Sequence, residues 1–254
     1  MILYLIPLLL AVFIVVYFRL YLFAFPYNRL VILMYHQVEK ESHEDLTVSL
    51  KNLEQQFSYL NSKKYTSYFF SELTLSAKRN IIITFDDGYR NNLEYLPSLL
   101  EKYNLKATIF IPTGFIEKGY NNYSMMTFDE IRSLDKNYFE IALHSHAHEN
   151  VRNVSLDFIE KDLKKNMEIL DAQNIGYSKV LAYPYGKYPQ KKHDKFAFFS
   201  ILKELGIDFA VRIGNKVNYY PTQRPYELCR IDIKGKDSLI KFKLKLIFGR
   251  LKLF

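Results

Sequence analysis

Two short polar stretches of the sequence carry residue types that could hold a metal ion and perform acid–base chemistry. The first is the adjacent carboxylate pair Asp86-Asp87, which follows the apolar run 81–85 and precedes Gly88. Two neighbouring carboxylates repel each other, so the pair favours a nearby cation. The alternative interpretation is an ordinary turn or helix N-cap, because Asp and Gly both favour turns.

The second stretch holds three of the six histidines, at positions 144, 146 and 148, directly after another apolar run. His144 and His148 are four residues apart, so on one helical turn they would face the same way. Two imidazoles and one carboxylate leave a coordination position open, which is the arrangement of catalytic zinc sites. The two stretches together therefore predict a metal site.

These residues need a scaffold that brings distant parts of the chain together. Short apolar runs alternate with amphipathic segments, which predicts parallel strands in an α/β fold, and about seven strands suit a barrel. His36, Asp86 and His144 each follow a predicted strand, where barrels gather their chemistry. Strands are expected at 30–35, 81–85, 107–111, 139–143, 180–183, 209–211 and 228–233, and helices at 49–63, 93–103, 127–134, 156–172 and 196–205.

The motifs resemble those of a known family. The TFDDGY stretch at 84–89 and the H-S-x-x-H stretch at 144–148 resemble the first two motifs of the polysaccharide deacetylase (NodB-homology) family, carbohydrate esterase family 4. The stretches 34–36, 182–186 and 229–231 resemble the branch that deacetylates poly-N-acetylglucosamine. This resemblance covers about residues 31–232 and implies a distorted (β/α) barrel of about seven strands.

The resemblance also implies roles for individual residues. Asp86 would be the general base, His36 the general acid, and the backbone N–H of Tyr185 would hold the oxyanion. The implied reaction is metal-dependent hydrolysis of N-acetyl groups from a cell-envelope polysaccharide, which releases acetate. The cofactor would be a divalent metal, with Zn²⁺ first and Co²⁺ or Ni²⁺ as alternatives. The residues that would bind it are Asp87, His144 and His148.

Two departures from the family pattern concern the base and the acid. The wider family has an arginine that orients the base, and here Ala182 stands at its position. Arg230 is expected to replace that arginine, with Arg224 as the second candidate. The wider family also places the acid in a late histidine motif, but no histidine follows His193 here. His36 must therefore act as the acid, or no histidine does.

Other functions and ligand sets stay open at this stage. Magnesium-dependent phosphoryl transfer could use the Asp-Asp-Gly turn, although histidines favour zinc-like metals. A catalytically weak, metal-bearing glycan-binding or scaffold protein in a membrane assembly would fit the loss of arginine at Ala182. His146 either points away from the metal or replaces His148. The glycan stays open among poly-N-acetylglucosamine, peptidoglycan, chitin-like oligomers and lipid-linked sugars, and so does the oligomeric state.

Both ends of the chain are predicted to contact a membrane. Residues 1–18 carry no charge, and with 20–25 they are long enough for a transmembrane helix from residue 2 to about 23. The alternative is a cleaved signal peptide, which the missing basic start and cleavage site oppose. Near the C-terminus, lysines oppose an apolar stripe, as in helices on anionic lipid. The stripe consists of Ile240, Leu244, Ile247, Phe248, Leu251 and Phe254. A last barrel helix or a strand is the alternative there.

The predicted domains are an anchor at 1–25, a catalytic domain at 26–236 and a basic amphipathic segment at 237–254. They describe a single-pass protein of the cell membrane. Arg19 and Arg29 weakly favour a cytoplasmic catalytic domain, whereas the resemblance favours an extracytoplasmic one. Nucleic acid is not an expected partner despite the net charge of +8, since the basic residues are scattered. The single cysteine excludes an internal disulfide.

Overall fold

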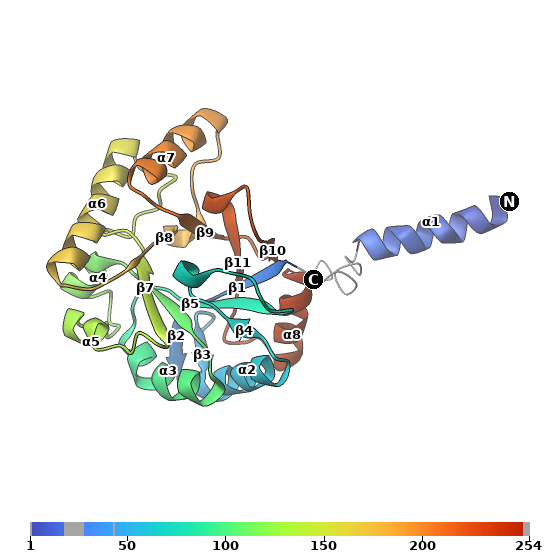
Figure 1. Cartoon of the computed structure of the whole chain (residues 1–254), viewed down its shortest axis with the longest axis horizontal. Coiled ribbons are helices and arrows are strands. Elements are labelled where there is room, and N and C mark those ends of the chain that lie inside the picture. Colours follow the sequence, from blue (N-terminus) through green and yellow to red (C-terminus); the bar gives the residue numbers. More distant parts are fainter. Residues whose placement is uncertain (1, 18–27, 43, 251–254) are drawn as a thin grey trace.

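Seven parallel strands form a closed ring, and helices surround it (Figure 1). In ring order the strands are β1 (Arg29–Tyr35), β5 (Asn80–Phe85), β6 (Ala107–Ile111), β7 (Phe139–Leu143), β8 (Ser178–Ala182), β9 (Phe209–Ile213) and β11 (Leu228–Asp232). The ring closes because β1 pairs in parallel with both β5 and β11. The computed structural model describes residues 2–17, 28–42 and 44–250. It confirms the predicted barrel of parallel strands.

The remaining elements lie outside this ring. The helices are α1 (Ile2–Tyr17), α2 (Leu50–Ser62), α3 (Arg90–Tyr103), α4 (Thr113–Lys118), α5 (Phe128–Arg132), α6 (Leu156–Ala172), α7 (Lys192–Glu204) and α8 (Leu239–Phe248). The short strands are β2 (Gln37–Glu39), β3 (Thr47–Ser49), β4 (Thr66–Ser67) and β10 (Asn218–Tyr219). Neither α4 nor these short strands follow from the hydrophobic pattern, because each is too short to show a period.

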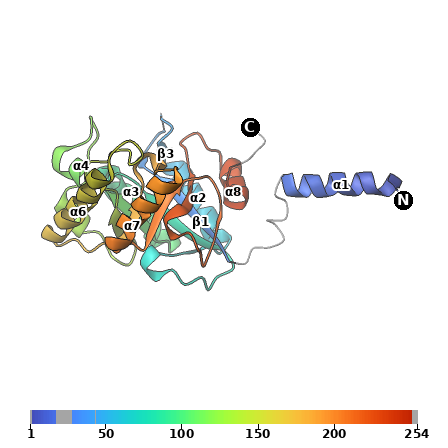
Figure 2. The ribbon, with the colours of Figure 1, turned by 90° about the horizontal axis from the view of Figure 1, so that it is seen from above.

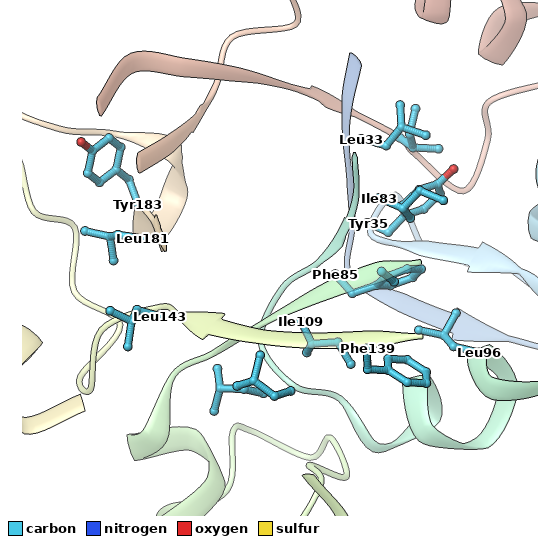
Figure 3. Packing of buried hydrophobic residues seen from close by; sticks show 14 of the residues in the cluster. Leu33, Tyr35, Ile83, Phe85, Leu96, Ile109, Phe139, Leu143, Leu181 and Tyr183 are labelled. Carbon is cyan, nitrogen blue, oxygen red and sulfur yellow. The ribbon is translucent and has the colours of Figure 1, made fainter. Parts of the chain in front are cut away.

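The strands are buried on both faces, which explains why each reads as a continuous apolar run. Successive side chains of a strand point to opposite faces. Leu30 and Ile32 of β1 therefore belong to the cluster inside the ring, whereas Leu33 and Tyr35 belong to the larger cluster between ring and helices. Figure 3 shows part of this outer cluster, with Leu33 of β1 beside Ile83 of β5.

Side-chain caps begin several of the helices. Thr127 and Glu130 form a capping box at the start of α5. The Thr127 hydroxyl accepts from the Glu130 N–H, and the Glu130 carboxylate accepts from the Thr127 N–H. The Ser155 hydroxyl accepts from the Phe158 N–H at the start of α6. Such caps satisfy N–H groups that a helix leaves unpaired at its first turn, so α6 has a defined start after the histidine stretch.

The transmembrane prediction is wrong. Helix α1 has 16 residues, and at 1.5 Å per residue it measures about 24 Å, less than the roughly 30 Å of a bilayer core. Among the described residues, none of the helices is both long and apolar enough to cross a membrane. The described part of α1 lies apart from the barrel in both views (Figure 1, Figure 2). Residues 18–25 of the predicted anchor lie outside the described residues. The same finding contradicts the predicted localisation as a single-pass membrane protein.

The C-terminal helix α8 packs on the barrel, as the alternative prediction had it. Of the predicted apolar stripe, Phe248 is buried but Ile240 is 70% exposed, and α8 instead buries Phe242 and Leu246, so the phase of the stripe is largely wrong. The Phe242 ring meets the Tyr59 ring of α2 edge-on. Lys245 turns inward to the buried Asp237 instead of facing water. Residues 251–254, the end of the predicted lipid-binding segment, lie outside the described residues.

Candidate active site

The carboxylate pair lies at the end of β5, where the backbone turns sharply. The sheet ladder reaches Asp86, whose N–H donates to the Tyr35 carbonyl at 3.0 Å. Asp87 and Gly88 then both adopt the left-handed conformation, each with φ of 73°. A Cβ on Gly88 would also lie 2.9 Å from Ile111. This turn separates the two neighbouring carboxylates, so they meet different partners.

Asp86 faces Arg230, which β11 supplies from the other side of β1. The guanidinium, only 1% exposed, donates to both Asp86 oxygens at 2.5 and 2.7 Å and to the Thr84 hydroxyl at 3.2 Å. Burial raises the pKa of Asp86, but the charge and hydrogen bonds of Arg230 together with the nearby His144 and His36 outweigh burial and leave that pKa below its usual value. Asp86 is therefore ionised and held in a fixed orientation. Arg224, the second candidate, is exposed.

Asp87 faces the two histidines that follow β7. Its Oδ1 lies 3.5 Å from His144 Nε2 and 3.3 Å from His148 Nε2. The ligand atoms of these three buried residues all lie within 4.8 Å of one another. The Nδ1–H of His144 donates a hydrogen bond to the Ala182 carbonyl at 2.8 Å. This contact directs Nε2 toward the carboxylates.

The histidines do not share a helical turn, contrary to the rationale given for their spacing. Residues 144–148 have no regular secondary structure. Ser145 and His148 adopt left-handed conformations, with φ of 64° and 54°, and the Ser145 hydroxyl accepts from the His148 N–H at 3.0 Å. A tight loop, rather than a helix, brings the two rings to a centroid distance of 4.7 Å.

The environment of Asp87 fits a bound cation. Its buried Oδ1 accepts no hydrogen bond of normal geometry from any of the described residues. Burial raises the pKa of Asp87, but the contacts with His144 and His148 together with the nearby His36 outweigh burial and hold that pKa well below its usual range. An ionised, buried carboxylate oxygen that faces two imidazole nitrogens is a donor set that zinc-like divalent metals prefer.

His36 and Tyr185 border this centre from two other elements. His36 follows β1, and its Nε2 lies 3.9 Å from Asp86 Oδ2. Tyr185, in the turn after β8, has φ of 58°, and its ring lies 5.0 Å from the His148 ring. A Cβ on Gly186 would lie 2.3 Å from Ile213, so this turn packs closely on β9. All seven predicted site residues therefore lie around one centre.

The remaining histidines lie elsewhere. His146 points away from the metal group, and its Nδ1 lies 3.0 Å from the Thr113 hydroxyl of α4. It therefore does not replace His148. His193 lies in the first turn of α7, and its side chain is 97% exposed. His43 lies outside the described residues.

Sequence reasoning missed Asp162 of α6, which contacts the histidine loop. Its carboxylate accepts from the backbone N–H groups of His146 and Ala147. The available signal was an acidic residue on the apolar stripe of the predicted helix 156–172, one turn before Asn166. Both side chains are buried, so the stripe carries a polar pair inside the fold.

Sequence comparison identifies similar proteins in two bacterial species. The Staphylococcus aureus (strain MRSA252) poly-beta-1,6-N-acetyl-D-glucosamine N-deacetylase is 26% identical over 246 residues, which cover 84% of this chain and 82% of that protein. The YxkH protein of Bacillus subtilis (strain 168) is 25% identical over 170 residues, 64% of this chain and 59% of that protein. The chain thus spans less than two thirds of the YxkH length.

Solved structures share the fold. The Streptococcus pyogenes deacetylase PplD, solved with acetate, superposes with a TM-score of 0.74 at 22% identity and covers 86% of this chain and 98% of its own. IcaB from Ammonifex degensii gives a TM-score of 0.73 at 18% identity, with coverages of 86% and 96%. The family model for polysaccharide deacetylase matches residues 76–210, more than half of the chain. This protein therefore belongs to the polysaccharide deacetylase family.

Proposed function

We propose that this protein is a metal-dependent hydrolase that removes N-acetyl groups from a cell-envelope polysaccharide and releases acetate. Family membership implies a hydrolytic deacetylase. The observation that carries the metal-dependent mechanism is the convergence of Asp87, His144 and His148 within 4.8 Å, with Asp86 beside them. A carboxylate outside the ligand set is then free to act as a base.

The three converging residues would hold one divalent metal, and we propose Zn²⁺, with Co²⁺ and Ni²⁺ as alternatives of similar ligand preference. Such a metal, when bound, polarises a carbonyl and lowers the pKa of water. His144 contributes a fixed ligand, because the Ala182 carbonyl holds its Nδ1 and leaves Nε2 for the metal. Asp87 contributes the charge that compensates the cation.

Asp86 accepts the proton of the attacking water. A base must be unprotonated before it acts, and the paired Arg230 keeps the Asp86 carboxylate ionised. The two guanidinium bonds also fix the plane of the carboxylate, which orients the base as a bidentate pair does. Arg230 thus takes the role of the family arginine whose position is occupied here by Ala182.

His36 and Tyr185 complete the reaction. The water oxygen bonds to the acetyl carbon, and the backbone N–H of Tyr185 donates to the carbonyl oxygen that becomes negative. The carbon–nitrogen bond then breaks, and His36 gives its proton to the departing nitrogen. The products are acetate and a free amine on the sugar. His36 suits this role because its Nε2 lies 3.9 Å from the base and reaches the same reacting group.

The substrate that we propose is poly-N-acetylglucosamine. This choice is supported by the relatives named poly-beta-1,6-N-acetyl-D-glucosamine N-deacetylase, which match most of this chain. The alternative of a catalytically weak, metal-bearing glycan-binding or scaffold protein rested on the missing arginine at Ala182. The contact between Arg230 and Asp86 leaves that alternative without a supporting observation.

Acetate release by the purified, zinc-loaded protein tests this function. We expect acetate from β-1,6-linked N-acetylglucosamine oligomers, less from β-1,4-linked oligomers of equal length, and none after treatment with a chelator. Re-addition of Zn²⁺ should restore the release. Metal bound without acetate from either oligomer would contradict the proposal and favour a scaffold.

A further inference from the structure

Helix α6 carries two buried polar side chains on its barrel-facing side. Asp162 is 9% exposed and Asn166 is fully buried, one helical turn further along. Their neighbours on this side are apolar, including Ile159 and Leu163, which are both buried. Burial of a carboxylate and an amide is costly unless their hydrogen bonds are satisfied. The hydrogen-bond partners of Asp162 and Asn166 therefore indicate why these polar residues are buried.

Asp162 holds the backbone of the histidine loop. One carboxylate oxygen accepts from the His146 N–H at 3.2 Å, and the other accepts from the Ala147 N–H at 2.8 Å. These two amides lie between the ligands His144 and His148. The loop has no strand or helix to fix it, so Asp162 supplies the bonds that regular structure would otherwise supply.

Helix α4 holds the same loop from another direction. The Gly114 N–H donates to the His146 carbonyl at 3.0 Å, and a Cβ on Gly114 would lie 2.5 Å from that oxygen. The Asn166 amide donates to the Thr113 hydroxyl, which contacts His146 Nδ1. His146 is therefore held on both sides by groups that do not reach the metal site.

We propose that Asp162 is a positioning residue for the metal centre and that His146 and Ala147 transmit its effect through the backbone. Ser145 and His148 adopt left-handed backbone conformations, which are unfavourable for residues other than glycine and which surrounding contacts must maintain. The two bonds to Asp162 hold the segment between them. The inference depends on the proposed metal site, because it concerns how closely His144 and His148 approach one ion.

Zinc affinity of the full chain tests this inference without any assay of turnover. In Asp162→Asn the new amide turns an N–H₂ group toward one of the two backbone donors, so one loop contact is lost while the side-chain volume is kept. We expect zinc to bind about 10- to 100-fold more weakly, the usual effect of removing a group that orients a ligand. A competition titration of Zn²⁺ against a fluorescent chelator measures the change.

Three further variants separate positioning from general stability. Asp157→Asn removes an exposed carboxylate of the same helix, and zinc affinity should stay at the wild-type value. Ile159→Val removes one buried methyl group and should lower the melting temperature without weakening zinc binding. Asp162→Glu keeps both acceptor oxygens on a longer side chain and should recover part of the affinity. This variant also serves if Asp162→Asn does not fold.

The outcomes are distinguishable. Wild-type zinc affinity in Asp162→Asn would overturn the inference, and so would an equal loss of affinity in Ile159→Val at a similar melting temperature. If the wild-type chain binds no zinc, the proposed metal centre itself fails and takes the inference with it. If Asp162→Asn binds zinc weakly and Ile159→Val binds it normally, the positioning role is supported even where acetate release is absent.

Discussion

Asp86 and Glu140 are both buried carboxylates of the barrel, yet their surroundings differ. Asp86 directly follows β5 and accepts from the charged Arg230, with an Nε2 atom of His36 and of His144 each 3.9 Å away. Glu140 lies near the start of β7 and accepts from three neutral donors: the Phe70 and Ser71 N–H groups and the Thr108 hydroxyl. Asp86 therefore lies among titratable side chains, whereas Glu140 connects residues 70–71 to the barrel through hydrogen bonds.

This difference teaches that burial alone does not identify a chemical residue. A carboxylate whose donors are all backbone and hydroxyl groups contributes to stability. A carboxylate that is ionised by an arginine and faces histidines can exchange a proton with a neighbouring group. The predictions below test this distinction.

The largest effect is expected for Asp86→Asn. An amide cannot take the proton of the attacking water, so acetate release should fall below detection, while zinc stays bound at wild-type stoichiometry. Acetate assays and metal analysis of the same preparation measure both quantities. His148→Ala is the matched variant, which should lose the zinc as well. Full zinc occupancy in His148→Ala would refute the ligand assignment.

His36→Ala should slow acetate release by about 10²- to 10⁴-fold, the usual contribution of a general acid or base. Zinc affinity should not change, because His36 is outside the ligand group. The measurement is kcat on an N-acetylglucosamine oligomer at saturating substrate. An unchanged kcat would remove His36 from the mechanism and leave the acid to another group.

Glu140→Gln should lower the free energy of unfolding by about 1–3 kcal/mol, since one N–H donor of residues 70–71 would meet an amide N–H₂ instead of an oxygen. Acetate release and zinc affinity should stay near wild type. Urea unfolding and the acetate assay test the two halves of this statement. A loss of turnover without loss of stability would break the comparison with Asp86.

The smallest effect concerns Asp237, a third buried carboxylate, beside α8. Burial raises its pKa, but the Lys234 N–H and the lysines Lys241 and Lys245 outweigh burial and lower that pKa. A lowered folded-state pKa stabilises the fold above the unfolded value and loses this contribution as pH falls through the folded value. The melting-temperature difference between wild type and Asp237→Asn should therefore shrink below about pH 5. A difference that grows toward acid pH would reverse the sign of this argument.

Much of the barrel could be predicted from the sequence alone. Each strand of the ring reads as an apolar run because both of its faces are buried, and that signal is local. The motif residues Asp86, Asp87, His144 and His148 were visible for the same reason, since each group lies within a few positions of chain. The phase of α8 was misjudged, because apolar content alone does not show which face a helix buries.

Tertiary structure decided the contacts between residues far apart in the chain. The sequence narrowed the missing arginine to Arg230 or Arg224, and only the closed ring places Arg230 against Asp86, 144 positions away. No local pattern showed that Asp162 holds the histidine loop or that this loop is not helical. Local periodicity reports which residues are buried, whereas the meeting of distant strand ends around a ring determines which of them touch.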